Sequence, residues 1–195
     1  ALGKQVAIDG KTLRRSFDRA ANKVGIHMVS AWCREAGMVL GQIKTDAKSN
    51  EITAVPKLLR LLDIRGATIT GDAMNCQRNI AKAVTRGEAD YILQVKDNQP
   101  TMRQEIADYF AFASKSLAKS PQTYVHTIEK GHGRIEERTY QHSGDIEWFA
   151  DLSRWSGLRG FGMMRTQRTV LNVEPAVTTT EDHYYITSFA DDVAR

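Results

Sequence analysis

The sequence predicts an α/β protein with a mixed sheet and helices on both faces, and three observations carry this prediction. Two apolar runs, at 26–33 and 38–44, flank a short turn and form a β-hairpin pattern. Helical and strand-like segments then alternate from residue 53 to residue 117. After residue 124 helical periodicity disappears and β-rich runs follow. We therefore expect a sheet with helical crossovers, followed by a β-rich insertion or subdomain.

The composition is that of one sizeable globular domain, or of one domain with an insertion. The chain has 195 residues, of which 42% are hydrophobic and 26% charged. Cys33 and Cys76 are too few for a disulfide scaffold, so we expect a reducing, cytoplasmic setting. No apolar run approaches the roughly 18 residues of a membrane span, and we expect no membrane partner. The net charge of +4 permits a nucleic-acid partner without requiring one.

The first half of the chain supplies the predicted core. A strand is expected over Gln5–Asp9, and a helix over about Thr53–Asp63, where Pro56 lies early enough to be tolerated. Ala67–Gly71 follows as a strand. A second helix over about Asn75–Arg86 and an apolar strand over Tyr91–Val95 come next. A third helix begins near Pro100, with an inner apolar face made of Met102, Ile106, Tyr109, Phe110, Ala113 and Leu117.

The second half is predicted to be β-rich. Four runs have strand-like composition with Gly, Ser or Asp turns between them: Tyr124–Glu129, Arg134–Gln141, Phe161–Val170 and His183–Ser188. At the end of the chain, Ser188 is followed three and four residues later by Asp191 and Asp192, which is typical of a helix start. We therefore expect this sequence to be a piece of a longer protein.

Two aspartates follow apolar strand-like runs. Asp9 ends Val-Ala-Ile-Asp, and Asp72 ends Thr-Ile-Thr-Gly-Asp. If the two strands are parallel, both carboxylates lie at the same sheet edge, where open α/β folds bind ligands. A carboxylate pair there would attract a hard cation such as Mg²⁺. The alternative is that each is a polar residue that starts a turn.

Basic and amide side chains follow the same predicted strands. Lys11, Arg14 and Arg15 come after Asp9, while Lys96, Asn98 and Gln99 come after the strand at 91–95. They predict a rim that contacts phosphate groups. The alternative is the ordinary polarity of strand ends.

A second candidate interface lies at 131–140. If this segment is a strand, Arg134, Glu136 and Arg138 share one face. The functional interpretation is a surface for the DNA backbone, with Glu136 orienting the two arginines. His132 is then either a phosphate donor or a structural residue. The alternative is an exposed salt-bridged ladder of little energetic consequence.

Together these motifs resemble a known family. Six segments carry the resemblance in this order: VAIDGKTLRRS, KSNEITAVPKLLRLLDIRG, TITGDAMNCQ, DYILQVKDNQP, GHGRIEERTY and HYYITS. They are similar to the catalytic domain of bacterial insertion-sequence transposases with an Asp-Asp-Glu triad, in the branch of the H-repeat-associated proteins. The resemblance implies an RNase-H-like core over 1–123, a β-rich insertion over 124–182, and a return to the core over 183–195.

The resemblance also implies a chemistry. Such enzymes hold two Mg²⁺ or Mn²⁺ ions with two Asp and one Glu, and cleave and join DNA phosphodiesters. Asp9 and Asp72 match the two aspartates. The family's Glu follows the last motif, beyond Arg195, so we expect an incomplete metal site here, with Glu136 as a weaker candidate for the third ligand. The implied partners are double-stranded transposon ends and target DNA, bound by a homodimer.

Two other functions stay open at this point. A haloacid-dehalogenase-like phosphatase also begins with an Asp after an apolar strand, but it requires an acid where this chain has Lys11. It also requires a further Asp soon after Asp72, where the chain reads Ala-Met-Asn-Cys. The third possibility is a degenerate transposase remnant that binds DNA without cleaving it.

Overall fold

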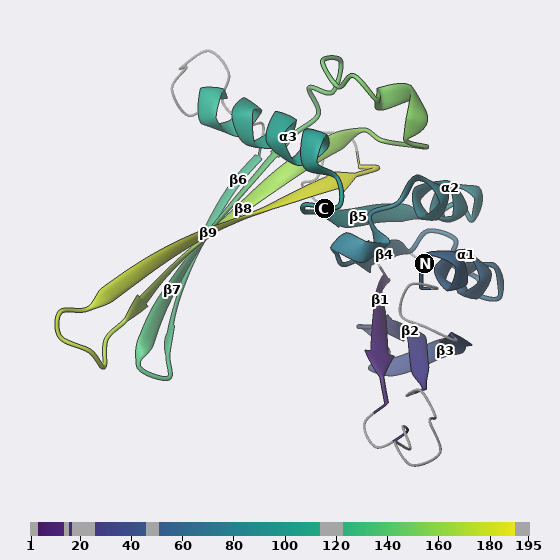
Figure 1. The fold of residues 1–195 in the computed structure, drawn as a ribbon, viewed down its shortest axis with the longest axis horizontal. Helices are drawn as coiled ribbons and strands as arrows, with labels where there is room; N and C mark the ends of the chain where they lie inside the picture. Colours follow the sequence, from purple (N-terminus) through teal and green to yellow (C-terminus); the bar gives the residue numbers. More distant parts are fainter. Residues whose placement is uncertain (1–3, 14–15, 17–25, 46–50, 114–122, 190–195) are drawn as a thin grey trace. The chain divides into compact units, whose positions relative to one another are not determined.

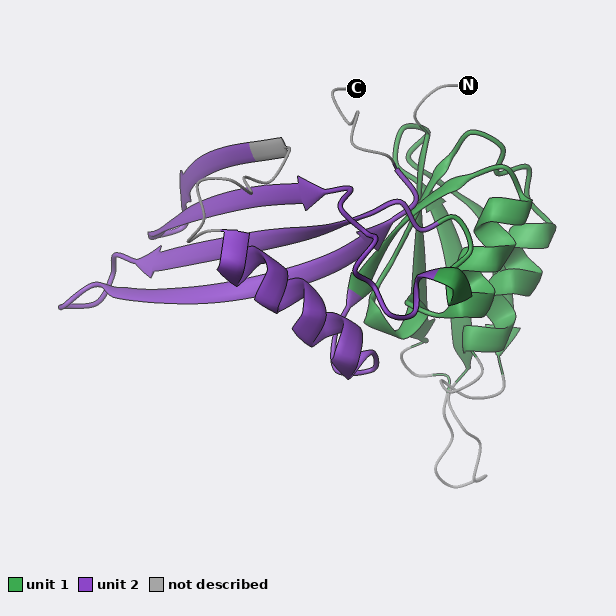
Figure 2. Ribbon diagram, turned by 90° about the horizontal axis from the view of Figure 1, so that it is seen from above, with its two compact units in different colours: residues 1–94, 153–157 green, residues 95–152, 158–195 purple. Residues whose placement is uncertain are grey.

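The protein forms two compact units, which Figure 2 colours separately. The computed structural model describes residues 4–13, 16, 26–45, 51–113 and 123–189. The first unit comprises residues 1–94 and 153–157, and the second comprises 95–152 and 158–195. None of the helices in the described part of the chain is long and apolar enough to span a membrane.

The first unit is built on a mixed sheet with the order β3-β2-β1-β4-β5 (Figure 1). The central strands β1, β4 and β5 are parallel, whereas β2 is antiparallel to both of its neighbours. Parallel strands joined by helices, next to an antiparallel hairpin, are the arrangement of an RNase-H-like fold, which confirms the predicted class. The strands are β1 (Gln5–Thr12), β2 (His27–Cys33), β3 (Met38–Thr45), β4 (Thr68–Gly71) and β5 (Asp90–Val95).

Helices α1 (Glu51–Arg60) and α2 (Arg78–Arg86) cover one face of this sheet (Figure 2). Apolar side chains alternate along the strands, and Val29 of β2 and Ile69 of β4 are fully buried. Val55 and Leu58 of α1 are buried as well. Cys33 and Cys76 are both buried. Burial raises the pKa of the Cys76 thiol to about 12.

The end of β1 and the start of α2, which both lie near the candidate site residues, differ from the prediction. The strand that carries Asp9 continues to Thr12, because it pairs with β2 along its whole length. The helix expected to start at Asn75 starts at Arg78, since residues 73–75 close a separate 3₁₀ turn, η2 (Ala73–Asn75). Gln77 is extended between the two, with φ −134° and ψ 143°. The side chain of Asp72 caps the start of η2, and the extended Gln77 separates η2 from α2.

The second unit consists of helix α3 (Pro100–Ala113) and four antiparallel strands in the order β9-β8-β7-β6. The helix buries Met102, Ile106 and Phe110, as the periodicity predicts, while Leu117 lies outside the described residues. Tyr109 and Phe110 contact the ring of Phe161, with centroids 4.8 and 5.5 Å away. The strands are β6 (Thr123–Gly131), β7 (Arg134–Ser143), β8 (Gly160–Val170) and β9 (Val177–Thr187), and a short 3₁₀ turn η3 spans Leu152–Arg154.

The four strands extend well beyond the part that α3 covers (Figure 1). Strand β9 starts at Val177, six residues before the predicted start, and pairs with β8 as far as Val170. Apolar side chains in this distal part are exposed, including Ile128 at 62% and Val177 at 50%. The distal strands therefore form a ribbon that carries little core of its own.

Candidate active site and nucleic-acid interface

Asp9 and Asp72 are brought to neighbouring positions at one edge of the first unit's sheet. Strands β1 and β4 are parallel, and their last paired residues are Ile8 and Gly71. The two aspartates are the next residue on each strand, and Asp72 keeps an extended backbone with φ −70° and ψ −178°. Both side chains are exposed. Adjacent strands lie about 4.8 Å apart, so two carboxylates of this register share one small volume.

Among the described residues, the hydrogen bonds of the Asp72 side chain use one of its two carboxylate oxygens. Its Oδ1 accepts from the backbone N–H of Asn75 at 3.2 Å and from Asn75 Nδ2 at 2.9 Å. Asn75 is itself buried, and its Oδ1 has no hydrogen-bond partner among the described residues. Asn75 thus holds Asp72 in place through one oxygen and leaves the other oxygen for a ligand.

Asp9 has a cationic neighbour on its own strand. Lys11 Nζ lies 3.2 Å from Asp9 Oδ2, and the two side chains are 79% and 57% exposed. An ion pair this exposed contributes little to stability and exchanges readily. Lys11 therefore contacts the predicted catalytic carboxylate. Arg14 and Arg15, which the sequence also assigns to DNA contact, lie outside the described residues.

The aspartate pair suits a hard divalent cation. Carboxylate oxygens are the ligands that Mg²⁺ prefers, and Mg²⁺ is commonly held by one or two carboxylates together with water. No third His, Cys, Asp or Glu joins the two aspartates to form a larger metal-binding group in the described ranges. The donor set therefore fits a weakly held ion.

A buried polar network, which sequence reasoning missed, lies under the same end of β1. His27 on β2 contacts Glu51 at the start of α1 through Nε2 and Oε1, and both side chains are only 4% exposed. The other ring nitrogen of His27 lies 2.9 Å from the hydroxyl of Thr12. A Cβ at Gly10 would lie 2.4 Å from the Glu51 carboxylate, so a side chain at residue 10 would displace Glu51 from its contact with His27. The network fixes the strand segment next to Asp9.

Lys96, Asn98 and Gln99 form a turn that directly follows β5 and precedes α3. The N–H of Gln99 donates to the carbonyl of Lys96 at 2.9 Å, and Lys96 and Asn98 are exposed. These residues belong to the second unit. Their contact with DNA stays a prediction.

In the second unit, Glu136 organises a cluster of three arginines, Arg134, Arg138 and Arg168. Its Oε1 is 2.9 Å from Nε of both Arg134 and Arg168, and its Oε2 binds Arg138. Arg138 also donates to Glu129 at 2.9 Å. The sequence predicts the first two arginines from the alternation along β7. Arg168 was missed, and it joins because β8 places it directly opposite Glu136.

The arginines of this cluster stabilise the charged form of Glu136. The hydrogen bond from Arg168, helped by the charges of Arg134 and Arg138, holds the pKa of Glu136 below its usual value. Glu136 is covered by its partners, whereas the arginines stay 47%, 25% and 47% exposed. One carboxylate therefore holds three guanidinium groups toward solvent, an arrangement suited to binding phosphate oxygens.

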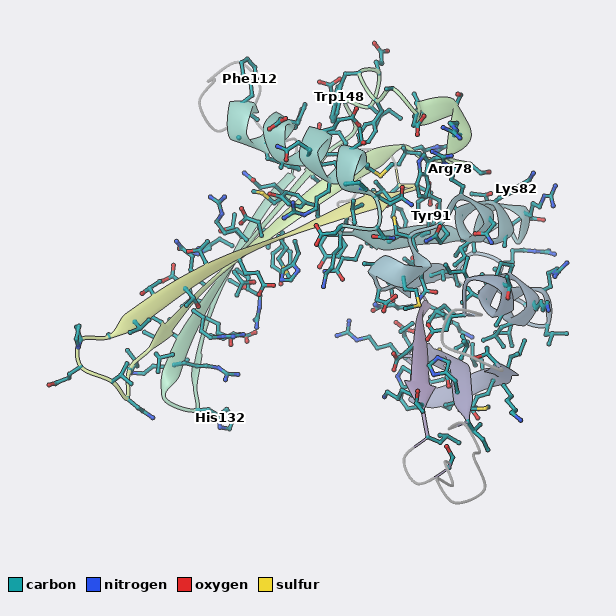
Figure 3. The ribbon with its side chains drawn as sticks, viewed as in Figure 1. Arg78, Lys82, Tyr91, Phe112, His132 and Trp148 are labelled. Atoms are coloured by element: carbon teal, nitrogen blue, oxygen red, sulfur yellow. The ribbon has the colours of Figure 1, made fainter. Side chains whose placement is uncertain are left out.

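His132 lies at the tip of the β6–β7 hairpin, as Figure 3 shows. Gly131 pairs with Arg134, so His132 and Gly133 form a two-residue turn with φ +48° and +72°. Positive φ at both positions is typical of the tight turns that match strand twist. The turn joins the two strands that the sequence predicts over Tyr124–Glu129 and Arg134–Gln141, and Arg134 is the first residue of the second.

The sheet order and the two exposed aspartates at adjacent strand ends define an RNase-H-like protein with a candidate metal-binding edge. The chain belongs to the family described as "Transposase DDE domain", whose profile matches residues 2–186. This confirms the family that the sequence motifs resemble.

Relatives with transposase names support the same family. The chain is 46% identical over 158 residues to "Putative transposase YncI" of Escherichia coli O157:H7, covering 80% of this chain and 40% of that protein. It is 38% identical over 187 residues to "H repeat-associated putative transposase YhhI" of Escherichia coli K12, covering 94% of this chain and 48% of that protein. The chain thus spans about half the length, or less, of these curated relatives.

Among solved structures, a piggyBac transposase synaptic complex with hairpin DNA overlaps the whole chain. The match covers 35% of that protein at 11% identity, with a TM-score of 0.46. A likeness this weak adds nothing to the assignment, which depends on the family match and the strand order.

Proposed function

We propose that the chain is the catalytic region of a transposase that cleaves and joins DNA phosphodiesters, with Asp9 and Asp72 as catalytic metal ligands. The observation that carries this proposal is the pairing of β1 with β4. Each of the two exposed aspartates directly follows the last residue pair, Ile8 and Gly71, so they lie at the same register position on neighbouring strands. Membership of the Transposase DDE domain family supplies the reaction class. Nothing in the fold or the comparisons supports the phosphatase alternative.

In the proposed reaction, the residues of this chain would bind the metal ions and orient the carboxylates that hold them. Asp9 and Asp72 would each offer at least one free oxygen to Mg²⁺ or Mn²⁺, while Asn75 keeps Asp72 from turning away. When bound, a pair of ions activates the attacking oxygen and stabilises the leaving oxygen. Lys11 already lies beside Asp9. With the Asp9 carboxylate engaged by a metal ion, the Lys11 side chain would contact a DNA phosphate instead.

Glu136 is poorly suited to be the third metal ligand. Both of its oxygens are bound by arginines, and a metal ion would have to displace them while lying among three positive charges. We propose that Glu136 is instead a positioning residue for a DNA-binding surface. Arg134, Arg138 and Arg168 of that surface would contact phosphates of double-stranded DNA.

The remaining contacts and boundaries extend this proposal. Lys96, Asn98, Gln99, His132 and the undescribed Arg14 and Arg15 would add to DNA binding, and a homodimer would hold transposon ends and target together. The core would comprise 1–123, the insertion 124–182, and the returning segment 183–195. Because its substrate would be DNA, we propose a cytoplasmic location.

The test is cleavage by the full-length protein that contains this chain. We expect Mn²⁺-dependent nicking of a plasmid that carries the transposon ends, with at least about 100-fold loss in Asp9→Asn and in Asp72→Asn. The exposed Asp108→Asn on α3 is a matched control and should keep its activity. Equal nicking by wild type and both aspartate variants would reject the assignment. Metal binding and DNA binding without any nicking would favour a degenerate remnant.

A further inference from the structure

A second basic surface lies between α1 and α2, in a groove of about 550 Å³. Residues from both helices and from the loops that follow them line it. Cationic side chains come from each wall, and two acids lie among them. The charged lining residues are Arg60, Asp63, Arg65, Lys82, Arg86 and Glu88.

The charge of this groove is only partly balanced. Arg65 pairs with Glu88 at 3.6 Å, and both side chains are more than 70% exposed. Asp63 accepts from the backbone N–H of Arg65 at 3.4 Å. Lys82 and Arg86 are exposed and form no ion pair with any acid in the described parts of the chain. The groove therefore presents an excess of positive charge toward solvent.

Helix α2 carries this charge as a stripe. Arg78, Lys82 and Arg86 are four residues apart and share one face, opposite the buried Ile80 and Val84. Figure 3 shows Arg78 and Lys82 projecting from this helix. Like charges at this spacing destabilise a helix, and a cation in the first turn opposes the helix dipole. Helix stability therefore gives no reason for the like-charge spacing, although the helix dipole favours Arg86 in the last turn. A polyanionic partner accounts for the whole stripe.

The dimensions suit a nucleic-acid backbone. From Arg78 to Arg86 the stripe is about 12 Å long at 1.5 Å per residue. One strand of a duplex presents a phosphate about every 3.4 Å along its axis. Lys82 and Arg86 line the groove on the α2 side, and Arg60 and Arg65 line the other wall, so these four cations match a run of several phosphates.

The groove lies at the other end of the strands that carry the aspartates. Arg65 and Glu88 precede the first residues of β4 and β5, whereas Asp72 follows the last residue of β4. The four residues of β4 alone separate the two edges by about 13 Å. A phosphate bound in the groove is therefore not the phosphate that reacts.

We propose that the α1–α2 groove is a second DNA-binding site, which holds the backbone of a duplex segment away from the scissile phosphodiester. The choice of DNA as the polyanion rests on the proposed function. The site would take phosphates without reading bases, because its charged lining consists of flexible exposed Lys and Arg side chains beside two carboxylates.

The test is fluorescence anisotropy with a labelled 30-base-pair duplex over a salt series. Lys82→Ala/Arg86→Ala removes two cations from one wall, and Arg60→Ala/Arg65→Ala removes two from the other. The control Lys44→Ala/Lys57→Ala removes the same charge from exposed positions outside the groove. Thermal unfolding by circular dichroism confirms that each variant is folded.

Each groove variant should bind duplex about tenfold more weakly than the control at 0.1 M salt, with a salt slope shallower by about two. Groove variants that bind duplex as tightly as the control would overturn the proposal. The proposed DNA-binding function would still stand if Arg134→Ala/Arg138→Ala weakened binding in the same assay. A wild-type chain that binds no duplex would overturn both proposals. Displacement of DNA from the groove by poly-glutamate at equal charge concentration would assign the groove to an acidic protein segment instead.

Discussion

The key carboxylates of the two units differ in their exposure and in the number of cations around them. In the first unit, Asp9 and Asp72 are exposed at adjacent strand ends, and their described partners are one lysine and one asparagine. In the second unit, Glu136 is covered by three arginines that use both of its oxygens. The difference teaches that the number of cations around a carboxylate decides its role. A carboxylate with a spare oxygen can take a metal ion, whereas one neutralised by guanidinium groups organises a surface for anions.

Glu51 adds a third environment to this comparison, and its removal gives the largest expected effect on folding. Glu51→Ala leaves His27 without its buried partner, so we expect the free energy of unfolding to fall by about 3 kcal/mol. Urea unfolding followed by tryptophan fluorescence measures it. The exposed Lys57→Ala on the same helix should change stability by less than about 0.5 kcal/mol. A loss in Glu51→Ala as small as in the control would show that the network does not hold β1 and α1 together.

The acid response of the second unit gives a smaller effect. Because the pKa of Glu136 is lowered in the folded state, its ion pairs add stability above the ordinary glutamate value of 4.5. That stability is lost as the pH falls through the lowered pKa. We expect the melting temperature of wild type to drop between pH 5 and about pH 3 more steeply than that of Glu136→Gln. If the melting temperatures of the two proteins fell in parallel with pH, Glu136 would not contribute to the loss of stability in acid.

Much of the candidate site follows from local sequence patterns. An apolar run that ends in Asp, and the rule that parallel strands end at a common edge, together predict the juxtaposition of Asp9 and Asp72. Alternation along β7 predicts that Arg134, Glu136 and Arg138 share a face. Both patterns need only a few neighbouring residues and a general rule of chain topology.

The residues that sequence reasoning missed depend on long-range register. His27 and Glu51 meet only because α1 packs its first turn over β2, although alternation with the buried Val29 already places His27 on the covered face. Arg168 joins Glu136 because the β7–β8 pairing puts them opposite each other, 32 residues apart. No local signal gives that register. The split of the expected helix into η2 and α2 occurs at Cys76 and Gln77, whose backbones are not helical.

The most direct test of the contrast between the two units is Mn²⁺ titration calorimetry on the chain and three variants. We expect weak binding by wild type and by Glu136→Gln, and no measurable binding by Asp9→Asn or Asp72→Asn, since each aspartate supplies half of the carboxylate donors. Retention of binding in both aspartate variants, together with its loss in Glu136→Gln, would contradict the assignment of the metal site to the β1–β4 edge.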